Sequence, residues 1–175
     1  IQPLMGHAQP SVNVPMLTGR EMTILLWSGD ADLTERYRSA AADERRTILE
    51  DEVANRPLPT DEQTESPGVG WLDFGWFGTP GDACRALSWL SEDDEALAVL
   101  TNDPLSPNPD LWPVLGFKGG SGRGIATTAW WMETGDGQPH AVVISLVNPS
   151  GELDLDSAVD LMVSLRDETH ALLAE

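Results

Sequence analysis

The chain has 175 residues, which is enough for one domain with a buried core. Hydrophobic residues make up 41% of it and charged residues 22%, values that are ordinary for a soluble globular protein. Its 29 acidic residues outnumber its 10 basic ones, and a net charge of −19 repels phosphate backbones and anionic lipid. The charge therefore argues against nucleic acid and membrane surfaces as partners, and no apolar run reaches the length of a transmembrane segment.

The residue types that hold metals or form disulfides are scarce. Cys84 is the only cysteine, so no internal disulfide and no cysteine-based zinc site can form, and its place on a predicted helix indicates a buried small hydrophobe. His7, His140 and His170 lie far apart, in different predicted elements. The sequence thus indicates no metal, no cofactor and no catalytic triad.

The N-terminal part of the chain has the pattern of short helices. Residues 1–16 contain three prolines and no helical period, which predicts an extended loop. Thr18 and Glu21 are spaced as a capping box, so a helix is expected to begin there and to end at Gly29-Asp30. Two acidic helical stretches are then predicted, at 33–42 and 43–55.

A long acidic loop is predicted near residues 56–70, where Pro, Asp, Glu, Thr and Gly predominate without an apolar period. It is a candidate flap or linker. The aromatic residues at 71–77 indicate a packed segment. Thr79-Pro80 then has the pattern of an N-cap with proline in the first turn, followed by a helix that buries Leu87 and a shorter helix that contains Leu100.

The last third of the chain alternates strand signals with turns. Strands are expected at 114–118, 125–132 and 140–147, with a glycine-rich turn after the first and an Asp-Gly hairpin at 134–138 after the second. The third strand is apolar on both faces, which predicts a central or covered position. A final helix at 155–174 has an apolar stripe wide enough to cover a sheet, namely Leu155, Val159, Met162, Leu165 and Leu173.

These patterns predict an α+β fold: an N-terminal helical region at 1–110, and a three-stranded antiparallel sheet with a covering C-terminal helix at 111–175. Both regions are expected to belong to one domain.

Lys118 is the only lysine of the chain, and it stands where a strand meets four glycines. Glycine lets a backbone approach a ligand closely. A cation beside exposed amides can bind a carboxylate or a developing oxyanion. The alternative is a solvated lysine at a strand end followed by a turn. The surrounding residues do not fit the phosphate-binding, dinucleotide-binding or nucleophile-elbow patterns.

The segment 117–121, Phe-Lys-Gly-Gly-Ser, followed by two strands and a terminal helix, resembles the Lys-Thr-Gly segment of β-lactamases and DD-peptidases. The order of PMLTGREM at 15–22, WFGTPGDACRAL at 76–87 and WPVLGFKGGSGRG at 112–124 is similar to that of actinobacterial β-lactamase-like serine hydrolases and lipoproteins. The resemblance extends from Gly6 to about Leu173. It implies an incomplete β-lactamase/transpeptidase-like fold, a secreted or cell-envelope location (with the cytoplasm as the alternative), and acyl transfer on a small-molecule or peptide amide or ester.

The same resemblance assigns roles to particular residues. Lys118 is implied as the catalytic lysine, which supports proton transfer from a serine and attracts a substrate carboxylate. Gly119, Gly120, Ser121 and Arg123 are implied in substrate binding or in the oxyanion hole. Gly119 replaces the hydroxyl residue of the family, and either Ser121 or Arg123 is a candidate to compensate. A tryptophan, Trp130 or Trp131, is expected in the wall of this site.

Two further expectations concern the acidic loop and the nucleophile. Glu62 or Glu65 lies where related enzymes carry a general base, although a solvated acidic loop is the alternative. The nucleophile of the family is the serine of Ser-x-x-Lys. Because Lys118 is the only lysine, no such motif exists in this chain, and Ser11-Val12-Asn13 resembles the family's Ser-Asp-Asn element only superficially.

The chain begins at Ile1 rather than Met, and we expect it to be the C-terminal portion of a longer protein. Three hypotheses follow. The chain is part of a serine hydrolase whose nucleophile comes from an N-terminal segment or a partner chain, or it is a catalytically inactive penicillin-binding-like binding or scaffold module, or it is a structural half-domain that assembles with another chain.

Overall fold

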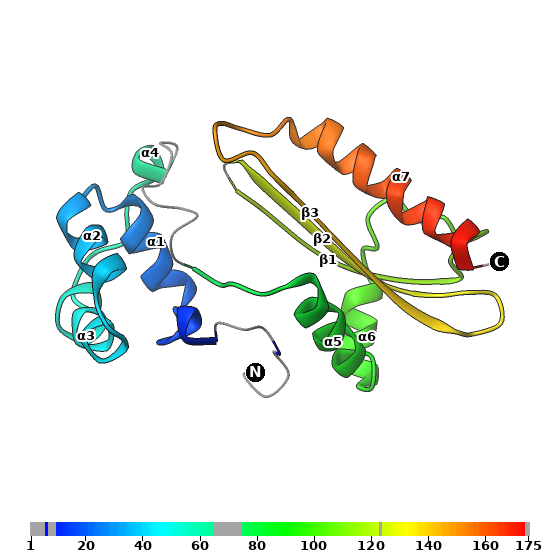
Figure 1. The fold of residues 1–175 in the computed structure, drawn as a ribbon, viewed down its shortest axis with the longest axis horizontal. Coiled ribbons are helices and arrows are strands. Elements are labelled where there is room, and N and C mark those ends of the chain that lie inside the picture. The colour runs from blue at the N-terminus through cyan, green and yellow to red at the C-terminus, as the bar shows by residue number, and fades with distance from the viewer. Residues whose placement is uncertain (1–5, 7–9, 65–74, 123, 174–175) are drawn as a thin grey trace. The chain divides into compact units, whose positions relative to one another are not determined.

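A computed structural model of the chain describes residue 6 and residues 10–64, 75–122 and 124–173. Within them it has seven α-helices and a three-stranded antiparallel sheet followed by a C-terminal helix, which confirms the predicted α+β class (Figure 1). Its contacts divide the chain into two compact units, His7–Phe77 and Ile1–Gly6 with Gly78–Glu175. The sequence predicts a boundary between a helical region and a sheet region at 110/111. In the structure, the compact unit that contains the strands also includes the two helices that precede them.

The unit His7–Phe77 is helical. It consists of a 3₁₀ turn at Pro10–Asn13, α1 at Gly19–Trp27, α2 at Ala31–Ser39, α3 at Ala42–Ile48, a π-helical segment at Leu49–Val53, and α4 at Asp61–Thr64. α1, α2, α3 and the π-helical segment share one apolar core, formed by Leu17, Ile24, Leu25, Leu26, Leu33, Tyr37, Ile48, Leu49 and Val53.

Capping residues set the boundaries of α1 and α2. The predicted capping box is confirmed, because the Thr18 hydroxyl accepts from the Glu21 N–H and the Glu21 carboxylate accepts from the Thr18 N–H at 2.6 Å. The turn to α2 passes through Gly29 with φ of +75°, and Asp30 accepts from the Leu33 N–H at 2.9 Å. That hydrogen bond, with the one from Arg56, lowers the pKa of Asp30.

Three local expectations in this unit need correction. Pro10–Asn13 is a 3₁₀ turn and not extended chain, and buried Asn13 donates to the Phe77 carbonyl at 2.7 Å and accepts from its N–H at 2.8 Å. The acidic loop contains α4, which Thr60 and Gln63 cap. In the aromatic segment Trp76 is exposed, although its indole N–H donates to the Leu17 carbonyl. Residues 65–74 lie outside the described residues.

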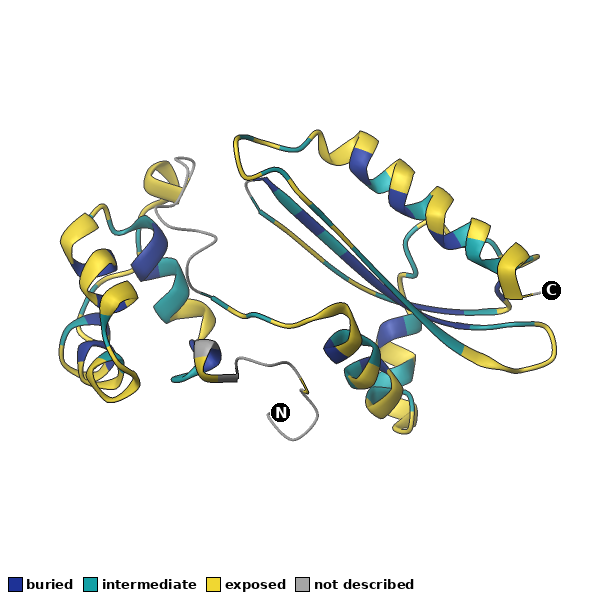
Figure 2. Cartoon of the chain, viewed as in Figure 1, coloured by how far each residue is buried: buried dark blue, intermediate teal, exposed yellow. Residues whose placement is uncertain are grey.

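The second unit is a sheet with helices on both faces. It contains α5 at Pro80–Leu90, α6 at Asp94–Thr101, β1 at Val114–Gly122, β2 at Ile125–Glu133, β3 at Pro139–Val147 and α7 at Leu155–Leu173. The strand order is β1-β2-β3, with both pairs antiparallel (Figure 1). Most of β2 is buried, as its dark blue colour in Figure 2 shows. Among the described helices, none has the length and apolar character needed to cross a bilayer.

The two faces of the sheet have separate cores, because side chains alternate along each strand. The predicted cover of the sheet by the last helix is confirmed: α7 packs on a core of Trp112, Leu115, Ala126, Trp130, Met132 and Met162. On the opposite face, α5 and α6 pack on a core of Leu87, Leu100, Ala129 and Trp131.

β1 is longer than predicted. It was expected to end at Lys118, but it pairs with β2 through Gly122, so the glycines at 119, 120 and 122 are strand residues and not a turn. β1 thus ends at Gly122, and β2 begins at Ile125. Gly124 has φ of +70°, and a Cβ there would lie 2.4 Å from the Asn148 carbonyl oxygen, so this position requires glycine.

β3 is an edge strand and is only half-buried, which corrects the prediction of a central or covered strand. The predicted hairpin before it is confirmed. Thr134 donates to the Gln138 carbonyl and Gly137 adopts φ of +78°, the left-handed conformation that this turn needs.

The buried side of α7 also differs from the predicted stripe. Leu155, Leu165 and Leu173 are each more than 40% exposed, whereas the buried residues are Ala158, Met162 and Arg166. The difference arises because a charged residue was not expected to face the sheet.

Arg166 is 0% exposed, and each of its three guanidinium nitrogens donates a hydrogen bond. It donates to the carbonyls of Leu105 and Ser106, both at 3.0 Å, and to the Asp167 carboxylate at 2.7 Å. It also lies 5.3 Å from the centre of the Trp130 ring. Arg166 therefore joins α7 to the segment before β1 and to the core of the sheet.

We predict that Arg166→Met lowers the free energy of unfolding by about 3 kcal/mol or more, because two backbone carbonyls and a carboxylate lose their buried donor. Chemical denaturation measures the change. Lys118→Met, at an exposed position, is the control and should have little effect. Equal loss in both variants would contradict the role given to Arg166.

Asp82 joins the start of α5 to the N-terminal segment. The Thr79 hydroxyl accepts from the Asp82 N–H, which confirms the predicted N-cap. The Asp82 carboxylate accepts in return from the Thr79 N–H and hydroxyl, and also from the Gly6 N–H at 2.7 Å and from Arg85. The Thr79 N–H, followed by the other donors, holds the pKa of Asp82 far below its usual range.

We predict that Asp82→Asn destabilises the fold at neutral pH and that the difference from the wild type shrinks in acid. Because the pKa of Asp82 is lower in the folded state than its unfolded value of about 3.9, its stabilisation is present above that value and is lost as the pH falls toward the folded pKa. Denaturation of both proteins at a series of pH values from neutral downward tests this. A difference in the free energy of unfolding that stays the same at every pH would contradict this role of Asp82.

Candidate functional site

A pocket of about 560 Å³ follows the outer edge of β1. Its walls are the end of α6 with the segment after it, the C-terminal half of β1, the start of β2 and the first turns of α7. The lining residues are Val99, Leu100, Asn102, Asp103 and Leu105, then 117–121, then Ala126, Thr127 and Thr128, and finally Leu155, Val159 and Met162. The pocket therefore reaches both faces of the sheet around an edge strand.

The strand register determines which backbone groups face this pocket. Asn148 donates to the Gly124 carbonyl at 2.7 Å and Thr134 donates to the Gln138 carbonyl at 3.1 Å, so even-numbered residues of β2 bond to β3. Its odd-numbered residues bond to β1, where their partners are even-numbered. In the described part of the chain no strand pairs with the outer side of β1, so the N–H and C=O groups of residues 117, 119 and 121 point outward along this free edge.

Lys118 lies on the α5/α6 face of β1, opposite Ala129 in the register. Its side chain is exposed, lines the pocket and donates from Nζ to the Gly119 carbonyl. The ammonium thus lies along the free edge, next to outward backbone groups.

The other predicted residues of this segment also line the pocket, with one change in their roles. The resemblance implies Gly119, Gly120 and Ser121 in substrate binding or in the oxyanion hole. The register turns the Gly120 amide toward β2, whereas Gly119 and Ser121 turn theirs outward. Arg123 lies outside the described residues.

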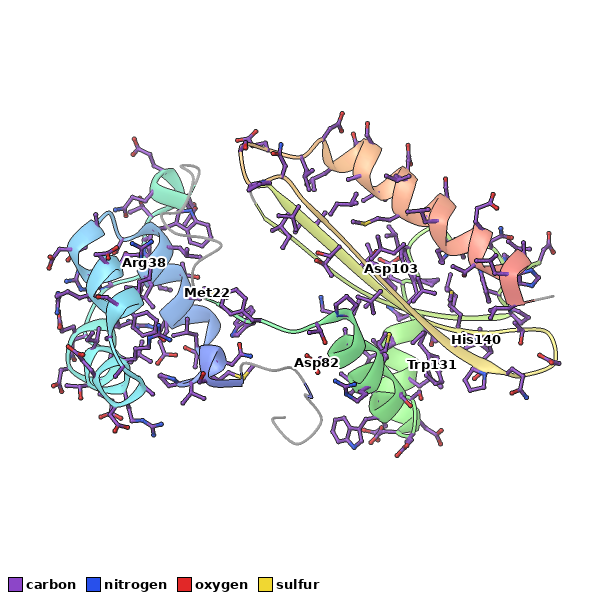
Figure 3. All side chains as sticks on the ribbon, viewed as in Figure 1. Met22, Arg38, Asp82, Asp103, Trp131 and His140 are labelled. Atoms are coloured by element: carbon purple, nitrogen blue, oxygen red, sulfur yellow. The ribbon has the colours of Figure 1, made fainter. Side chains whose placement is uncertain are left out.

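The expected tryptophan wall is replaced by a phenylalanine. Among the described residues that line the pocket, neither Trp130 nor Trp131 is present; Trp130 lies beneath α7, and Trp131 (labelled in Figure 3) lies on the opposite face. Phe117 provides the aromatic surface, and its ring centre lies 5.7 Å from that of Trp130.

The Phe117 ring occupies the space beside Gly119. Both residues are on the α7 face of β1, and a Cβ at position 119 would lie 2.5 Å from Phe117 Cζ. A side chain with a hydroxyl cannot be added at 119 unless the ring moves. Gly120, by contrast, has no neighbouring atom within 4 Å of an added Cβ.

Two of the remaining polar side chains of the lining form hydrogen bonds with other residues of the chain. Thr127 shares a hydrogen bond of 2.8 Å with Ser145, and Thr128 donates to the sulfur of Met162. Asp103, labelled in Figure 3, adds a carboxylate just after α6, so the pocket carries charges of both signs. In the part of the chain that the structure describes, no group of His, Cys, Asp and Glu side chains could hold a metal ion.

The candidate general bases belong to the other compact unit. Glu62 is exposed in α4, within His7–Phe77, and Glu65 lies outside the described residues.

Sequence reasoning missed Phe117, Asp103 and Leu105 as lining residues. Phe117 and Gly119 are two apart in a strand and so share a face, a signal that was hidden because position 119 was assigned to a turn. Asp103 and Leu105 follow a helix in an irregular segment, and no pattern in the sequence places such residues beside β1.

Comparison of the chain with models of known protein families and with curated proteins found no match.

We predict that Gly119→Ala destabilises the fold by about 1 kcal/mol or more, because the new methyl group overlaps the Phe117 ring. In a Phe117→Ala background the same substitution should cost nothing, which a double-mutant cycle measures as a coupling energy. Gly120→Ala is the matched control and should be tolerated. If the effects of Gly119→Ala and Phe117→Ala on the free energy of unfolding were additive, the overlap between the methyl group and the ring would be contradicted.

Proposed function

We propose that the chain carries the substrate-binding strand of a β-lactamase-like or DD-peptidase-like serine hydrolase, an acyl-transfer enzyme that cleaves amides or esters. The observation that supports this most directly is the placement of Lys118 on a free strand edge that lines a pocket. The incomplete β-lactamase/transpeptidase-like fold and a secreted or cell-envelope location belong to the same proposal, which rests on the resemblance at 112–124.

A peptide-like substrate fits this edge by adding a strand to the sheet. Its backbone would pair with the outward groups of Phe117, Gly119 and Ser121, and its side groups would contact the apolar wall beneath α7. A substrate carboxylate would replace the Gly119 carbonyl as the acceptor of the Lys118 ammonium.

The chemistry needs a serine hydroxyl from a segment other than these 175 residues. Its oxygen adds to the substrate carbonyl while a base takes its proton, and the carbonyl oxygen becomes negatively charged. Gly119 and Ser121 lie two residues apart on an extended strand, so one of their outward N–H groups, and not both, is the donor to that oxygen. Lys118 adds a positive charge nearby. The intermediate then expels the amine or alcohol, which takes up the proton, and water later releases the acyl group.

The strong negative charge of the chain does not prevent binding of an anion here. Screening over about 8 Å at physiological salt makes the nearest charges dominant. Among the described residues that line this pocket, Lys118 carries a positive charge and Asp103 a negative one. A substrate carboxylate would therefore bind only where it approaches Lys118 more closely than Asp103.

A second candidate function is a catalytically inactive, penicillin-binding-like binding or scaffold module. Two observations favour it. The 175 residues contain no Ser-x-x-Lys, and the position of the family's hydroxyl residue is Gly119, beside which the Phe117 ring fills the space. In this case the pocket would bind a ligand reversibly and hold it without cleavage.

We predict that benzylpenicillin binds this chain reversibly and forms no covalent adduct, because no serine has a lysine one helical turn away. Mass spectrometry tests the adduct, and NMR titration of the Gly119 and Ser121 amides measures the affinity. Lys118→Ala should weaken binding at least about tenfold, the loss expected for a charge-assisted hydrogen bond.

The methyl ester of benzylpenicillin is the matched control, since it lacks the carboxylate and should bind the wild type and Lys118→Ala equally. Equal affinity of both proteins for benzylpenicillin itself would end the role given to Lys118. A stoichiometric adduct would show that a nucleophile lies within the chain.

A further inference from the structure

The pocket has two parts, one on each face of β1. Phe117, Gly119 and Ser121 lie on the α7 face, whereas Lys118 lies on the face of α5 and α6. Asp103, the other charged residue of the described lining, follows directly after α6. We call the part between β1 and the first turns of α7 the α7 slot.

The walls of the α7 slot are apolar and come from three separate segments. They are the side chains of Leu105, Phe117, Leu155, Val159 and Met162. Leu155 is 44% exposed and Val159 is half-buried, although both line the pocket. The slot thus presents apolar surface that a ligand can cover, which is the usual character of a small-molecule site.

The floor of the α7 slot is made of small residues. Gly119 of β1 and Ala126 and Thr128 of β2 share this face of the sheet and line the pocket. Thr128 is 4% exposed, and its hydroxyl donates to the Met162 sulfur at 3.3 Å. Because this buried hydroxyl already has a partner, the floor favours an apolar occupant over a polar one.

One wall of the α7 slot belongs to a strained turn. Leu105 and Ser106 have φ of +37° and +53°, in the left-handed region that residues other than glycine rarely adopt. Arg166 donates to the carbonyls of both residues. Strain of this kind persists only where surrounding contacts hold it, and it is concentrated at functional sites. The Leu105 wall is therefore held in place before a ligand arrives, which favours binding.

The polar and apolar parts of the pocket meet at Gly119. Its carbonyl accepts from the Lys118 ammonium, and the residue itself forms part of the slot floor. Its N–H points outward along the free edge, where it can pair with a ligand amide. A ligand that uses all three features must carry an anionic group, an amide and an apolar group within a few bonds of one another.

We propose that this site binds an N-acyl amino acid, free or at the end of a peptide, whose large apolar side chain enters the α7 slot. The carboxylate of such a ligand pairs with Lys118, and this part of the inference rests on the proposed function. Its amide pairs with the outward backbone of Gly119. The side chain stands on the carbon between these two groups, which places it beside the slot floor.

The test compares N-acetylleucine with N-acetylasparagine, each as the racemate. The two probes have the same charge and side chains of nearly the same shape, and they differ in polarity. NMR titration of the isotope-labelled chain, followed at the Gly119, Ser121 and Val159 amides, measures both affinities. We expect N-acetylleucine to bind at least about tenfold more tightly, because burial favours its side chain and strips the asparagine amide of water.

The variants locate the origin of this preference. Leu155→Asn should remove most of it, because a polar group of similar size replaces one wall of the slot. Leu161→Asn is the matched control and should keep the preference: Leu161 is 48% exposed on the same helix and lies outside the described lining of the pocket. Val159→Phe is a second slot variant, whose ring should fill the space and weaken N-acetylleucine binding at least about tenfold.

Lys118→Ala separates this proposal from the proposed function. If Lys118 binds the carboxylate, this variant weakens both probes by the same factor, and N-acetylleucinamide, which lacks the carboxylate, binds the wild type weakly. If Lys118 has no such role, both affinities are unchanged in Lys118→Ala while the preference for leucine persists, so that the proposed function fails and the α7 slot stands.

Three results would overturn the α7 slot. They are equal affinities of the wild type for N-acetylleucine and N-acetylasparagine, the same preference in Leu155→Asn as in Leu161→Asn, and no binding of N-acetylleucine at millimolar concentration.

Discussion

The C-terminal unit depends on the buried guanidinium of Arg166. A single side chain of α7 binds two carbonyls of the segment before β1, pairs with Asp167 and lies against the Trp130 ring. Asp167 in turn accepts from Asn108 and Trp112. The segment that supplies Asp103 and Leu105 to the pocket is thereby attached to the helix on the other side of that pocket. A charged group in a core makes this geometry specific, because a misplaced α7 would leave the charge without acceptors.

The two edges of the sheet are chemically different although the same strand lies between them. The β1 edge is rich in glycine, carries the only lysine and opens into a pocket with polar groups. The β3 strand is largely apolar and contains no Asp, Glu, Lys or Arg. An edge with glycine and a cation suits a small or peptide-like ligand that must bind and leave. An apolar edge suits a lasting contact, since its exposure in water is unfavourable.

Much of the fold was predictable because its signals are local. The Thr18 and Thr79 caps, the Asp-Gly hairpin and the three strands in sequential order follow from short patterns, and the structure bears them out. The errors arise where tertiary contacts override local preference. The glycines after Lys118 have turn propensity, yet pairing with β2 keeps them in the strand, and a buried Arg166 cannot be recognised from an apolar period. Of the site, Lys118 and residues 119–121 were named from sequence, whereas the places of Phe117, Asp103 and Leu105 in the pocket depend on tertiary structure.

The central position of β2 couples the two edges through backbone parity. Successive residues of this strand bond alternately to β1 and to β3, and successive side chains alternate between the two cores. One residue inserted or deleted within β2 would exchange both assignments beyond that point, so that β2 side chains of one core would turn toward the other. Changes in chain length are therefore expected to accumulate at residues 134–138 and 148–154, and β2 is expected to keep its length.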